Sequence, residues 1–547
     1  MKTFHAIILL SLAILSTDLN AQRTAYLNVN NVSAGIGVGG NLFSTPDTFA
    51  LLEVPKGSAI KPLFTSALWM TGFDNSNLLH CSANTFFANG FDFFDGPISA
   101  NYNPAYDAFY NRVFKITKSQ IQSHTAHAFP ISSTQVDASI LYWPSIGNPY
   151  VLADYSVSIN SPLAPFFDTD GDNLYDPVKG DYPLICGEEG VFFVFNDDKA
   201  IHTETNGLGM KLEIRGMAEV FTDNSSSDIP FQKRAINNTV FVRYEIENKS
   251  LQNWQNFSLG FWEDPDLGCY NNDRVGCDTI RNLMFAYNGT SVDNDCGQLG
   301  YHQTRIAHGI EFLNSEMKIF GVFTGLGAAA AYSDPSTYVQ YRSYETAHWN
   351  DGSPFTEGGL GHGGITPTNF LFPGSPNDTS AWSDVMSGLP SGDRRMFGTT
   401  EFHVDTFVQF NSGVTQTVDF AFIGSYDSTG TNLTVVDTLK RDADEVKAFY
   451  NNVILLCRAN GLTGIENENN EKLSVSVYPN PTSSQFVVES VLKINALELL
   501  DLSGRIVWKK NVEARRTVVD VSCLQNGVYL LQAESEGKRV MKKVVIE

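Results

Sequence analysis

The sequence predicts a mainly β fold, with a β-sandwich-like body closed by one late helix and a second, small β-sandwich at the C-terminal end. Three observations lead to this prediction. Short apolar runs alternate along the body with loops rich in Gly, Asn, Asp and Pro. Residues 239–247 alternate strictly between the two faces of a strand. Residues 474–547 repeat short runs and turns at the spacing typical of a sandwich.

The strands of the body are predicted from the alternation of apolar and polar positions. In the clearest run, Val240, Val242, Tyr244 and Ile246 point to one face, because successive side chains of a strand alternate. The late helix is predicted at residues 436–453, where apolar residues recur at a spacing of three and four. The predicted body strands are Val191–Phe195, Lys211–Phe221, Thr239–Glu247, Met317–Phe323 and Thr415–Tyr426.

Chain length and composition predict the domain organisation. The body, residues 22–458, exceeds the usual size of a single hydrophobic core, so two packed β subdomains are expected, with a boundary near residues 181–190. Residues 459–473 are polar, acidic and poor in apolar side chains, which predicts an exposed linker. The C-terminal module then comprises residues 474–547.

Residues 1–21 are predicted to be a cleavable signal peptide. Lys2 precedes an apolar run from Ala6 to Leu15, and Ala21 is a small residue at the expected cleavage site. The apolar run is too short to span a bilayer, and no later segment reaches the roughly 20 apolar residues that a transmembrane helix needs. The mature chain is expected to start near Gln22 after export into the periplasm.

Four sequence blocks give the C-terminal module a more specific character. They are Tyr478–Pro481, Leu499–Val507, Leu524–Leu531 and Lys542–Ile546. Together they resemble the type A C-terminal sorting domain of the type IX secretion system of Bacteroidetes. The resemblance implies that the secretion machinery recognises the tail at the outer membrane and removes it, and that the body is released or attached to surface lipopolysaccharide. An ordinary terminal immunoglobulin-like (Ig-like) β-sandwich is the alternative, because many proteins share that architecture.

Parts of the body are also similar to known sequences. Gly180–Asp197, Trp262–Asp278 and His348–Gly364 resemble segments of a group of large exported Bacteroidetes proteins that carry the same sorting tail. That group brings no established activity with it. The resemblance therefore implies a surface or extracellular location and a continuous β-rich architecture.

The charge of the chain limits its partners. The formal net charge is −23 at pH 7, and Lys and Arg do not cluster in the body. Phosphate backbones would repel such a surface, which disfavours nucleic acid as a partner. An acidic surface suits an exported protein that binds cations.

The cysteines indicate disulfides in an oxidising compartment. Of the seven cysteines, Cys523 lies in the tail, which leaves an even set of six in the body. Six cysteines allow 15 pairings. Cys269 and Cys277 close the shortest loop and are the first candidate pair. The remaining body cysteines are Cys81, Cys186, Cys296 and Cys457.

The sharpest chemical motif is the stretch DTDGDNLYD, which places carboxylates at Asp168, Asp170, Asp172 and Asp176. Ca²⁺ takes six to eight oxygen ligands, and a tight loop can turn acidic side chains on alternate residues inward. The pattern resembles the calcium loops of thrombospondin type 3 repeats and dockerins. It departs from the EF-hand because Lys179 stands where that loop has a glutamate. A structural calcium ion is predicted, with a solvated acidic turn as the alternative.

A second acidic stretch runs from Trp262 to Asp278. It either completes a cation site or forms a disulfide-bridged loop, since Asp, Asn and Gly are also the residues of exposed turns. Its carboxylates would also suit a glycoside hydrolase, but separation and orientation decide that reaction. No catalytic residue is assigned for this reason. The acidic residues of this stretch are Glu263, Asp264, Asp266, Asp273 and Asp278.

The sequence leaves two alternative functions for the body. The preferred interpretation is a noncatalytic surface or secreted protein, stabilised by calcium and disulfides, whose aromatic loops bind glycans, host proteins or neighbouring cells. The alternative is an extracellular hydrolase of polysaccharide or protein. A pocket with two convergent carboxylates, one of raised pKa, would favour the hydrolase.

Overall fold

The computed structural model describes the body and the C-terminal module as two compact units that divide between residues 462 and 463, inside the predicted linker. The predicted signal peptide, residues 462–473 of the predicted linker and Cys523 lie outside the described residues. The described residues are 22–87, 90–224, 234–323, 330–404, 406–461, 475–500, 506–522, 524–535 and 538–546.

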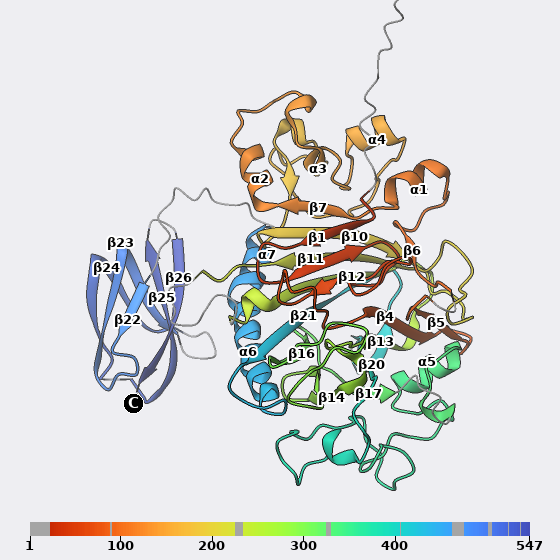
Figure 1. Cartoon of the computed structure of the whole chain (residues 1–547). Helices are drawn as coiled ribbons and strands as arrows, with labels where there is room; N and C mark the ends of the chain where they lie inside the picture. Colours follow the sequence, from red (N-terminus) through yellow and green to blue (C-terminus); the bar gives the residue numbers. More distant parts are fainter. Residues whose placement is uncertain are drawn as a thin grey trace, which may run out of the picture. The chain divides into compact units, whose positions relative to one another are not determined.

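A large antiparallel sheet forms the centre of the body (Figure 1). All five predicted body strands are present, four of them in this sheet and the fifth, β17, in the second sheet. The strands of the large sheet are β14 (Asp273–Asp278), β15 (Leu283–Asn288), β16 (Arg305–Phe312), β21 (Thr415–Asp427), β12 (Thr239–Asn248), β11 (Leu212–Val220), β10 (Glu189–Asn196) and β6 (Phe94–Asp95), in this order, with β7 (Phe114–Thr117) also paired to β10.

A second sheet of the body packs against the first. Its central strand, β13, pairs antiparallel with both β4 and β18. The strands of the second sheet are β4 (Thr65–Phe73), β5 (Leu79–Ala83), β13 (Trp254–Asp264), β17 (Ile319–Phe323), β18 (Arg395–Glu401), β19 (His403–Val404) and β20 (Phe407–Phe410). Two smaller sheets are formed by β1 (Thr24–Leu27), β2 (Ser33–Gly37) and β3 (Leu52–Glu53), and by β8 (Phe166–Phe167) and β9 (Tyr182–Pro183).

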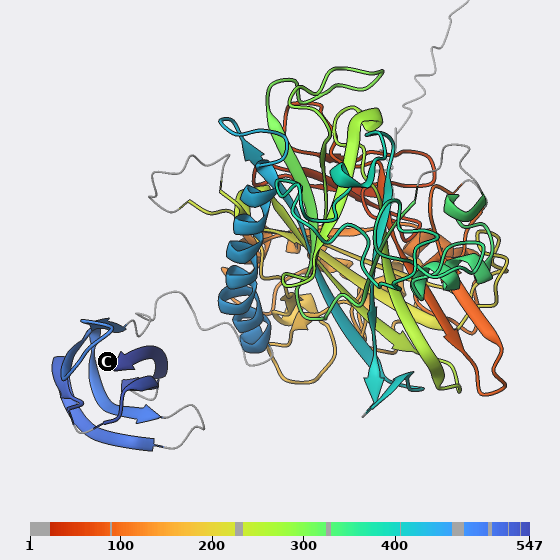
Figure 2. The ribbon, with the colours of Figure 1, turned by 90° about the horizontal axis from the view of Figure 1, so that it is seen from below.

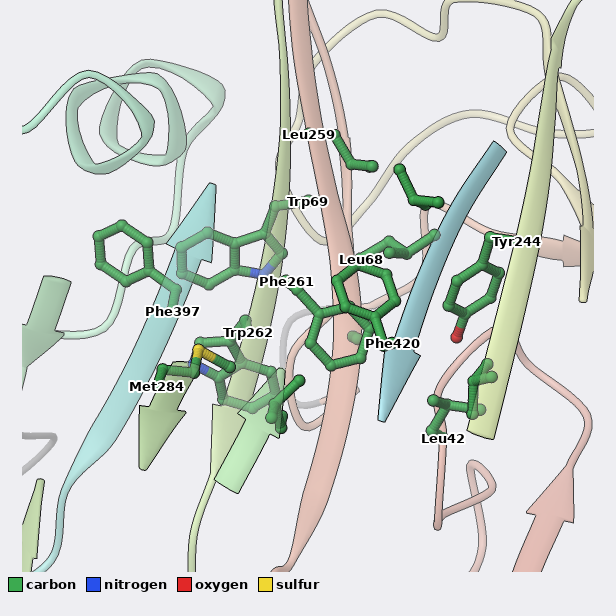
Figure 3. Close-up of a cluster of buried hydrophobic side chains, with 14 of the residues drawn as sticks. Leu42, Leu68, Trp69, Tyr244, Leu259, Phe261, Trp262, Met284, Phe397 and Phe420 are labelled. Carbon is green, nitrogen blue, oxygen red and sulfur yellow. The ribbon is translucent and has the colours of Figure 1, made fainter. Parts of the chain in front are cut away.

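The two large sheets share one hydrophobic core (Figure 3). The four apolar residues of β12 that were predicted to share a face are all buried in this core. Phe261 of β13 meets Phe420 of β21 across the sheets, with ring centroids 4.5 Å apart. Trp69 and Trp262 stack at 6.1 Å within the second sheet. Burial of each such ring stabilises the fold by about 1.5–3 kcal/mol, so aromatic residues hold the sandwich together.

The predicted late helix covers the outer face of the large sheet (Figure 2). It is α6 (Val435–Phe449), which continues through a π-helical turn, Tyr450–Ile454, into α7 (Leu455–Gly461). Leu439 packs so close to β16 that a Cβ on Gly309 would lie 3.1 Å from it. Because α7 ends at Gly461 and the predicted linker starts at residue 459, the helix extends into the first residues of that linker.

Helices α1 to α4 form a cap that the sequence analysis did not predict. They lie on one side of β7 and β10 (Figure 1), where Trp143 packs against Phe192 of β10 with ring centroids 5.8 Å apart. The helices are short, so their apolar periodicity is weak, and their ends are fixed by local caps such as the Thr117–Gln120 capping box. The helices besides α6 and α7 are α1 (Pro104–Tyr110), α2 (Lys118–Thr125), α3 (Ala138–Leu141), α4 (Pro149–Tyr155) and α5 (Tyr338–Glu345).

The predicted division of the body at residues 181–190 is wrong. β10 begins at Glu189 and pairs with β6 and β7 from before this segment and with β11 from after it. Residues 181–190 mark the end of the helical cap instead. Because the sheets share one core, the body is a single unit.

The C-terminal unit is β-rich, as predicted, but its strands form one curled sheet. The second strand, β23, is long, and its pairing with β24 shifts register between Glu489 and Ile494. Thr482, in the segment between the first two strands, forms a bridge with Ile546 of the last strand, so the sheet approaches a barrel. Its strands are β22 (Val475–Tyr478), β23 (Gln485–Leu500), β24 (Ile506–Asp520), β25 (Gly527–Ser535) and β26 (Lys538–Ile546).

Candidate functional site

The predicted calcium loop lies between β8 and β9 and is folded by its own carboxylates. Asp168 accepts hydrogen bonds from the backbone N–H groups of Gly171 at 2.7 Å and Asn173 at 2.8 Å. Gly171 and Asn173 both adopt positive φ, at 76° and 63°, which tight turns require and which these residues tolerate. Gly171 and Asn173 therefore let the chain turn tightly around the Asp168 carboxylate.

The structure brings together only part of the predicted ligand set. Asp168 and Asp170 each place an oxygen within 4.8 Å of an oxygen of Asp181, a buried residue that sequence reasoning missed. Asp181 accepts hydrogen bonds from Thr169 and Asp176 at 2.8 Å, and burial raises its pKa to about 6. Two residues of the motif and one beyond it thus form the possible ligand group.

Asp172 and Asp176 of the motif face Lys179. Its Nζ lies 3.3 Å from Asp172 Oδ2, 3.7 Å from Asp176 Oδ2 and 3.4 Å from Asp170 Oδ2. The hydrogen bond from the Leu174 backbone holds the pKa of Asp172 below its ordinary value, and Lys179 adds to this effect. An ammonium group therefore already compensates part of the negative charge of the loop, and calcium would compete with it.

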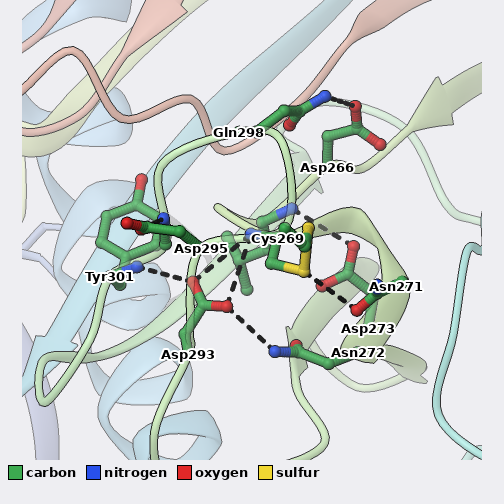
Figure 4. Close-up of a disulfide and its surroundings, with 12 residues drawn as sticks. Asp266, Cys269, Asn271, Asn272, Asp273, Asp293, Asp295, Gln298 and Tyr301 are labelled. Carbon is green, nitrogen blue, oxygen red and sulfur yellow. Dashed lines mark hydrogen bonds between the residues drawn. A yellow bond between two sulfur atoms is a disulfide. The ribbon is translucent and has the colours of Figure 1, made fainter.

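The predicted disulfide between Cys269 and Cys277 is wrong. Cys269 pairs with Cys296 (Figure 4), and Cys186 pairs with Cys457. Strand β14 starts at Asp273 and carries Cys277 into the core, where its Sγ lies 3.6 Å from the carbonyl of Leu371. Cys81 is also a buried free thiol. The short sequence separation misled the prediction because an extended strand carries Cys277 away from Cys269.

The second acidic stretch is divided among separate environments. Glu263 pairs with His308 at 3.1 Å inside the core, and Asp278 pairs with Arg281 at 3.0 Å and Lys440 at 3.2 Å. Asp273 is buried and accepts a hydrogen bond from the backbone of Leu267, while the remaining two carboxylates, Asp264 and Asp266, line a cavity.

This cavity, which we call the acidic pocket, is defined by Asp264, Asp266, Asp393 and Arg395. Asp264 is the last residue of β13, Arg395 is the first residue of the neighbouring strand β18, and Asp393 precedes that strand by two residues. The three carboxylates place oxygens within 4.8 Å of one another. The cavity has a volume of about 370 Å³ and is also lined by Gln298, Tyr270 and three phenylalanines. Strand pairing, rather than sequence proximity, assembles the site.

Negative charge exceeds positive charge in the acidic pocket. Arg395 donates a hydrogen bond to Asp393 at 3.0 Å, and its Nε lies 3.8 Å from Asp264 and 3.4 Å from Asp334. Burial raises the pKa of Asp266 to about 6 and that of Asp264 well above its ordinary value. Four carboxylates thus lie around one guanidinium, an arrangement that suits either a bound cation or a shared proton.

A row of phenylalanine rings, one exposed and four half-buried, leads to the acidic pocket. Successive ring centroids are 5.4, 6.2, 4.5 and 6.2 Å apart, and the last ring lies under the Arg395 guanidinium at 5.1 Å. We call this the phenylalanine row, and its members in order are Phe91, Phe87, Phe49, Phe64 and Phe86. These rings are distant in the sequence from the acidic stretch, and only their aromatic character could have indicated them.

Comparison with known proteins identifies the tail. Residues 476–547 match the family described as the secretion system C-terminal sorting domain. No curated protein matches the chain. Among solved structures, a polysaccharide lyase is similar over 61% of this chain and 34% of its own length, with 8% identity and a TM-score of 0.18. The chain thus spans about a third of that lyase, and a likeness this weak carries no argument about fold or activity.

The family match confirms the prediction made from the four sequence blocks of the tail. Strands β22 to β26 belong to the matched region, although residues 501–505 of the second block lie outside the described residues. Within the described residues, every helix is too short or too polar to cross a membrane. The chain therefore carries a type IX secretion C-terminal sorting domain and is a protein exported to the cell surface or beyond it.

Proposed function

We propose that the body is a noncatalytic glycan-binding module of the cell surface or its surroundings. The observation that carries this proposal is the phenylalanine row, which ends at the acidic pocket. Aromatic faces stack against the C–H faces of sugar rings, and carboxylate, amide and guanidinium groups pair with hydroxyls. Gln298 and Arg395 supply donors at the end of the row, and Asp393, which is less buried than Asp264 and Asp266, supplies an acceptor. Surface or host proteins are the other partners that such a module would take.

The route of export is part of the proposal. A signal peptide, residues 1–21, would take the chain into the periplasm, and the type IX machinery would recognise the tail and remove it. The body would then be released or attached to surface lipopolysaccharide. Deleting residues 474–547 should leave the body in the periplasm of the producing cells. Normal export of the truncated chain, detected by immunoblot of cell fractions, would contradict this route.

A structural calcium ion in the 168–176 loop would stabilise the body. Asp168, Asp170 and Asp181 offer the converging oxygens, and the remaining ligands would be backbone carbonyls or water. The double substitution Asp168→Asn and Asp170→Asn should abolish the rise in melting temperature that this loop contributes on adding Ca²⁺. An identical calcium-dependent rise in the variant and the wild type would refute a calcium ion at this loop.

An extracellular hydrolase of polysaccharide or protein is the second candidate function. It is favoured by the pKa of Asp266, which burial raises to about 6 beside other carboxylates in a pocket. A general acid requires such a raised pKa. Against a glycosidase, Asp264 is 4% exposed and Asp266 is 7% exposed, so a sugar has little access to a position between them. We therefore prefer binding without catalysis.

A glycan and polysaccharide array distinguishes the two functions. The purified protein is applied with Ca²⁺, and both retained protein and released sugars are measured. Retention without products would support a binding module, whereas released sugars would establish the hydrolase. The variants Phe49→Ala and Phe64→Ala should each weaken retention by about 2–13-fold, since one stacking ring contributes about 0.5–1.5 kcal/mol. Phe407→Ala, at a ring 68% exposed and outside the row, is the matched control. Unchanged retention in both row variants would exclude the row as the binding surface.

A further inference from the structure

We infer that the acidic pocket is a divalent-cation site of the calcium class, held by Asp264, Asp266 and Asp393 and separate from the 168–176 loop. The inference does not depend on glycan binding, because cation binding is measured without a glycan. It rests on the spacing of the carboxylates, on a buried carboxylate oxygen that accepts no hydrogen bond among the described residues, and on the disulfide that anchors the segments of Asp266 and Gln298.

The spacing of the three carboxylates matches that of ligands on one ion. Each residue offers an oxygen, and these oxygens lie within 4.8 Å of one another. Ca²⁺–O bonds of about 2.3–2.6 Å place two ligands of one ion up to about 5 Å apart. Without a cation, the same proximity would be repulsive, since like charges in a buried site oppose ionisation. A single divalent ion converts this repulsion into coordination.

The carboxylate of Asp264 provides the second, independent observation. Asp264 is 4% exposed and lines the cavity, and its Oδ1 has no hydrogen-bond partner among the described residues. The nearest guanidinium nitrogen, Arg395 Nε, is 3.8 Å away, beyond hydrogen-bond distance. Asp393 Oδ1 likewise has no hydrogen-bond donor in the described part of the chain. A buried carboxylate oxygen without a donor is costly, and a metal ion removes that cost.

The one guanidinium of the pocket does not replace the ion. Arg395 gives its short hydrogen bond to Asp393 Oδ2 at 3.0 Å and shares its Nε side with Asp334 at 3.4 Å. Among the described residues, Asp266 forms no ion pair with Arg395, and its carboxylate accepts a hydrogen bond from the Gln298 amide at 3.0 Å. The cavity of about 370 Å³ leaves room for the water molecules that complete a coordination number of six to eight.

The Cys269–Cys296 disulfide positions the ligands. Cys269 follows Asp266 by three residues and Cys296 precedes Gln298 by two, so the disulfide ties the Asp266 segment to the segment whose amide orients it (Figure 4). Groups that hydrogen-bond a ligand typically change metal affinity by about 10–100-fold. Gln298 is therefore a positioning residue, and reduction of this disulfide should weaken the site without removing a ligand.

Isothermal titration calorimetry of Ca²⁺ into the purified, chelator-treated protein tests the inference. The double substitution Asp266→Asn and Asp393→Asn should remove one equivalent of bound Ca²⁺, and Gln298→Ala should weaken the same equivalent by about 10–100-fold. The loop variant with Asp168→Asn and Asp170→Asn should keep this equivalent. Asp47→Asn, at a side chain 72% exposed and paired with Arg23, is the matched control and should bind like the wild type.

The melting temperature of the same variants, measured with and without Ca²⁺, also tests the inference. Without Ca²⁺, replacing the mutually repelling Asp266 and Asp393 carboxylates should leave the melting temperature unchanged or raise it. The rise in melting temperature on adding Ca²⁺ should become smaller. If the double variant does not fold, Asp393→Asn alone replaces it, because Asp393 is half-buried. Unchanged calcium stoichiometry and affinity in a folded pocket variant would overturn the inference. So would loss of all Ca²⁺ binding in the loop variant, or no Ca²⁺ binding by the wild type.

Discussion

Cys186 and Cys457 form a disulfide that joins residues 271 positions apart, so that α7 at the end of the body is fixed to the segment ahead of β10. The bond closes a loop that includes most strands of both large sheets. Cross-linking so long a loop restricts the unfolded chain strongly, and removal of a native disulfide typically costs about 2–5 kcal/mol. The end of the body is therefore held independently of the tail that follows.

The variant Cys457→Ser should lower the free energy of unfolding of the body by about 2–5 kcal/mol. Urea denaturation followed by tryptophan fluorescence measures this loss. Cys296→Ser, which opens a loop with a sequence separation of 27, is the comparison and should cost less, because loop entropy grows with length. Equal stability of Cys457→Ser and the wild type would show that the helix packing alone fixes the C-terminal end.

Among the carboxylates of the large sheet, replacement of Asp419 is expected to lower the free energy of unfolding most. It is buried and accepts hydrogen bonds from Arg243 at 3.0 Å, Arg458 at 2.8 Å and Tyr450 at 2.7 Å. These partners hold its pKa below the ordinary value even though burial acts in the opposite direction. Asp419→Asn should lower the free energy of unfolding by about 3–5 kcal/mol, because two guanidinium groups lose their counter-charge.

The exposed pair between Asp444 and Arg281 is the control for Asp419. Its nitrogen and oxygen atoms lie 2.8 Å apart, but the Asp444 side chain is 59% exposed. Asp444→Asn should therefore cost less than about 1 kcal/mol. If urea denaturation shows similar losses of unfolding free energy for Asp419→Asn and Asp444→Asn, burial does not make the Asp419 pairs more stabilising than an exposed pair. The depressed pKa of Asp419 also means that its contribution is present at neutral pH and is lost as the pH falls through the folded-state pKa.

The contribution of Glu311 to stability should change with pH in the direction opposite to that of Asp419. It is 2% exposed on β16, and burial raises its pKa from 4.5 to about 8. The folded state therefore binds more protons than the unfolded state between these values, and stability falls as the pH rises through this window. Glu311→Gln should remove that decline, so its advantage over the wild type should grow from pH 5 to pH 8 in thermal melts.

Glu316→Gln serves as the control for Glu311, since the Glu316 side chain is 70% exposed. It should shift the melting temperature equally at pH 5 and pH 8. A constant difference between Glu311→Gln and the wild type across this range would mean that Glu311 is ionised in the folded protein at neutral pH.

Lys179 is expected to limit calcium binding at the 168–176 loop. Its ammonium lies within 4 Å of three carboxylates of the motif. In a solvated loop, a unit charge a few ångströms beyond the ligand oxygens opposes a divalent ion by about 1–2 kcal/mol. Lys179→Gln should therefore raise the calcium affinity of the loop by about 5–30-fold, measured by calorimetry in the background of the acidic-pocket double variant. Lys318→Gln, at a half-buried lysine elsewhere that pairs with Glu316, should leave the affinity unchanged. An unaltered affinity in Lys179→Gln would mean that the ammonium does not compete with calcium.

The sequence by itself determined the features that depend on neighbours along the chain. Alternation fixed strands such as β12, and apolar spacing fixed α6, because each pattern reports which face of an element is buried. The four tail blocks identified the sorting domain, and the closely spaced aspartates of DTDGDNLYD indicated an acidic loop. Each of these signals is local.

Only the tertiary structure decided the features that join distant segments. The partners of Cys269 and Cys457, the fusion of the body into one core and the meeting of Asp264 with Asp393 all follow from strand pairing. A strand specifies which face is buried, but many partners satisfy that requirement equally well, and the register is chosen by packing of the whole sheet. For that reason the sequence located half of the acidic pocket, at Asp264 and Asp266, and the fold supplied the rest.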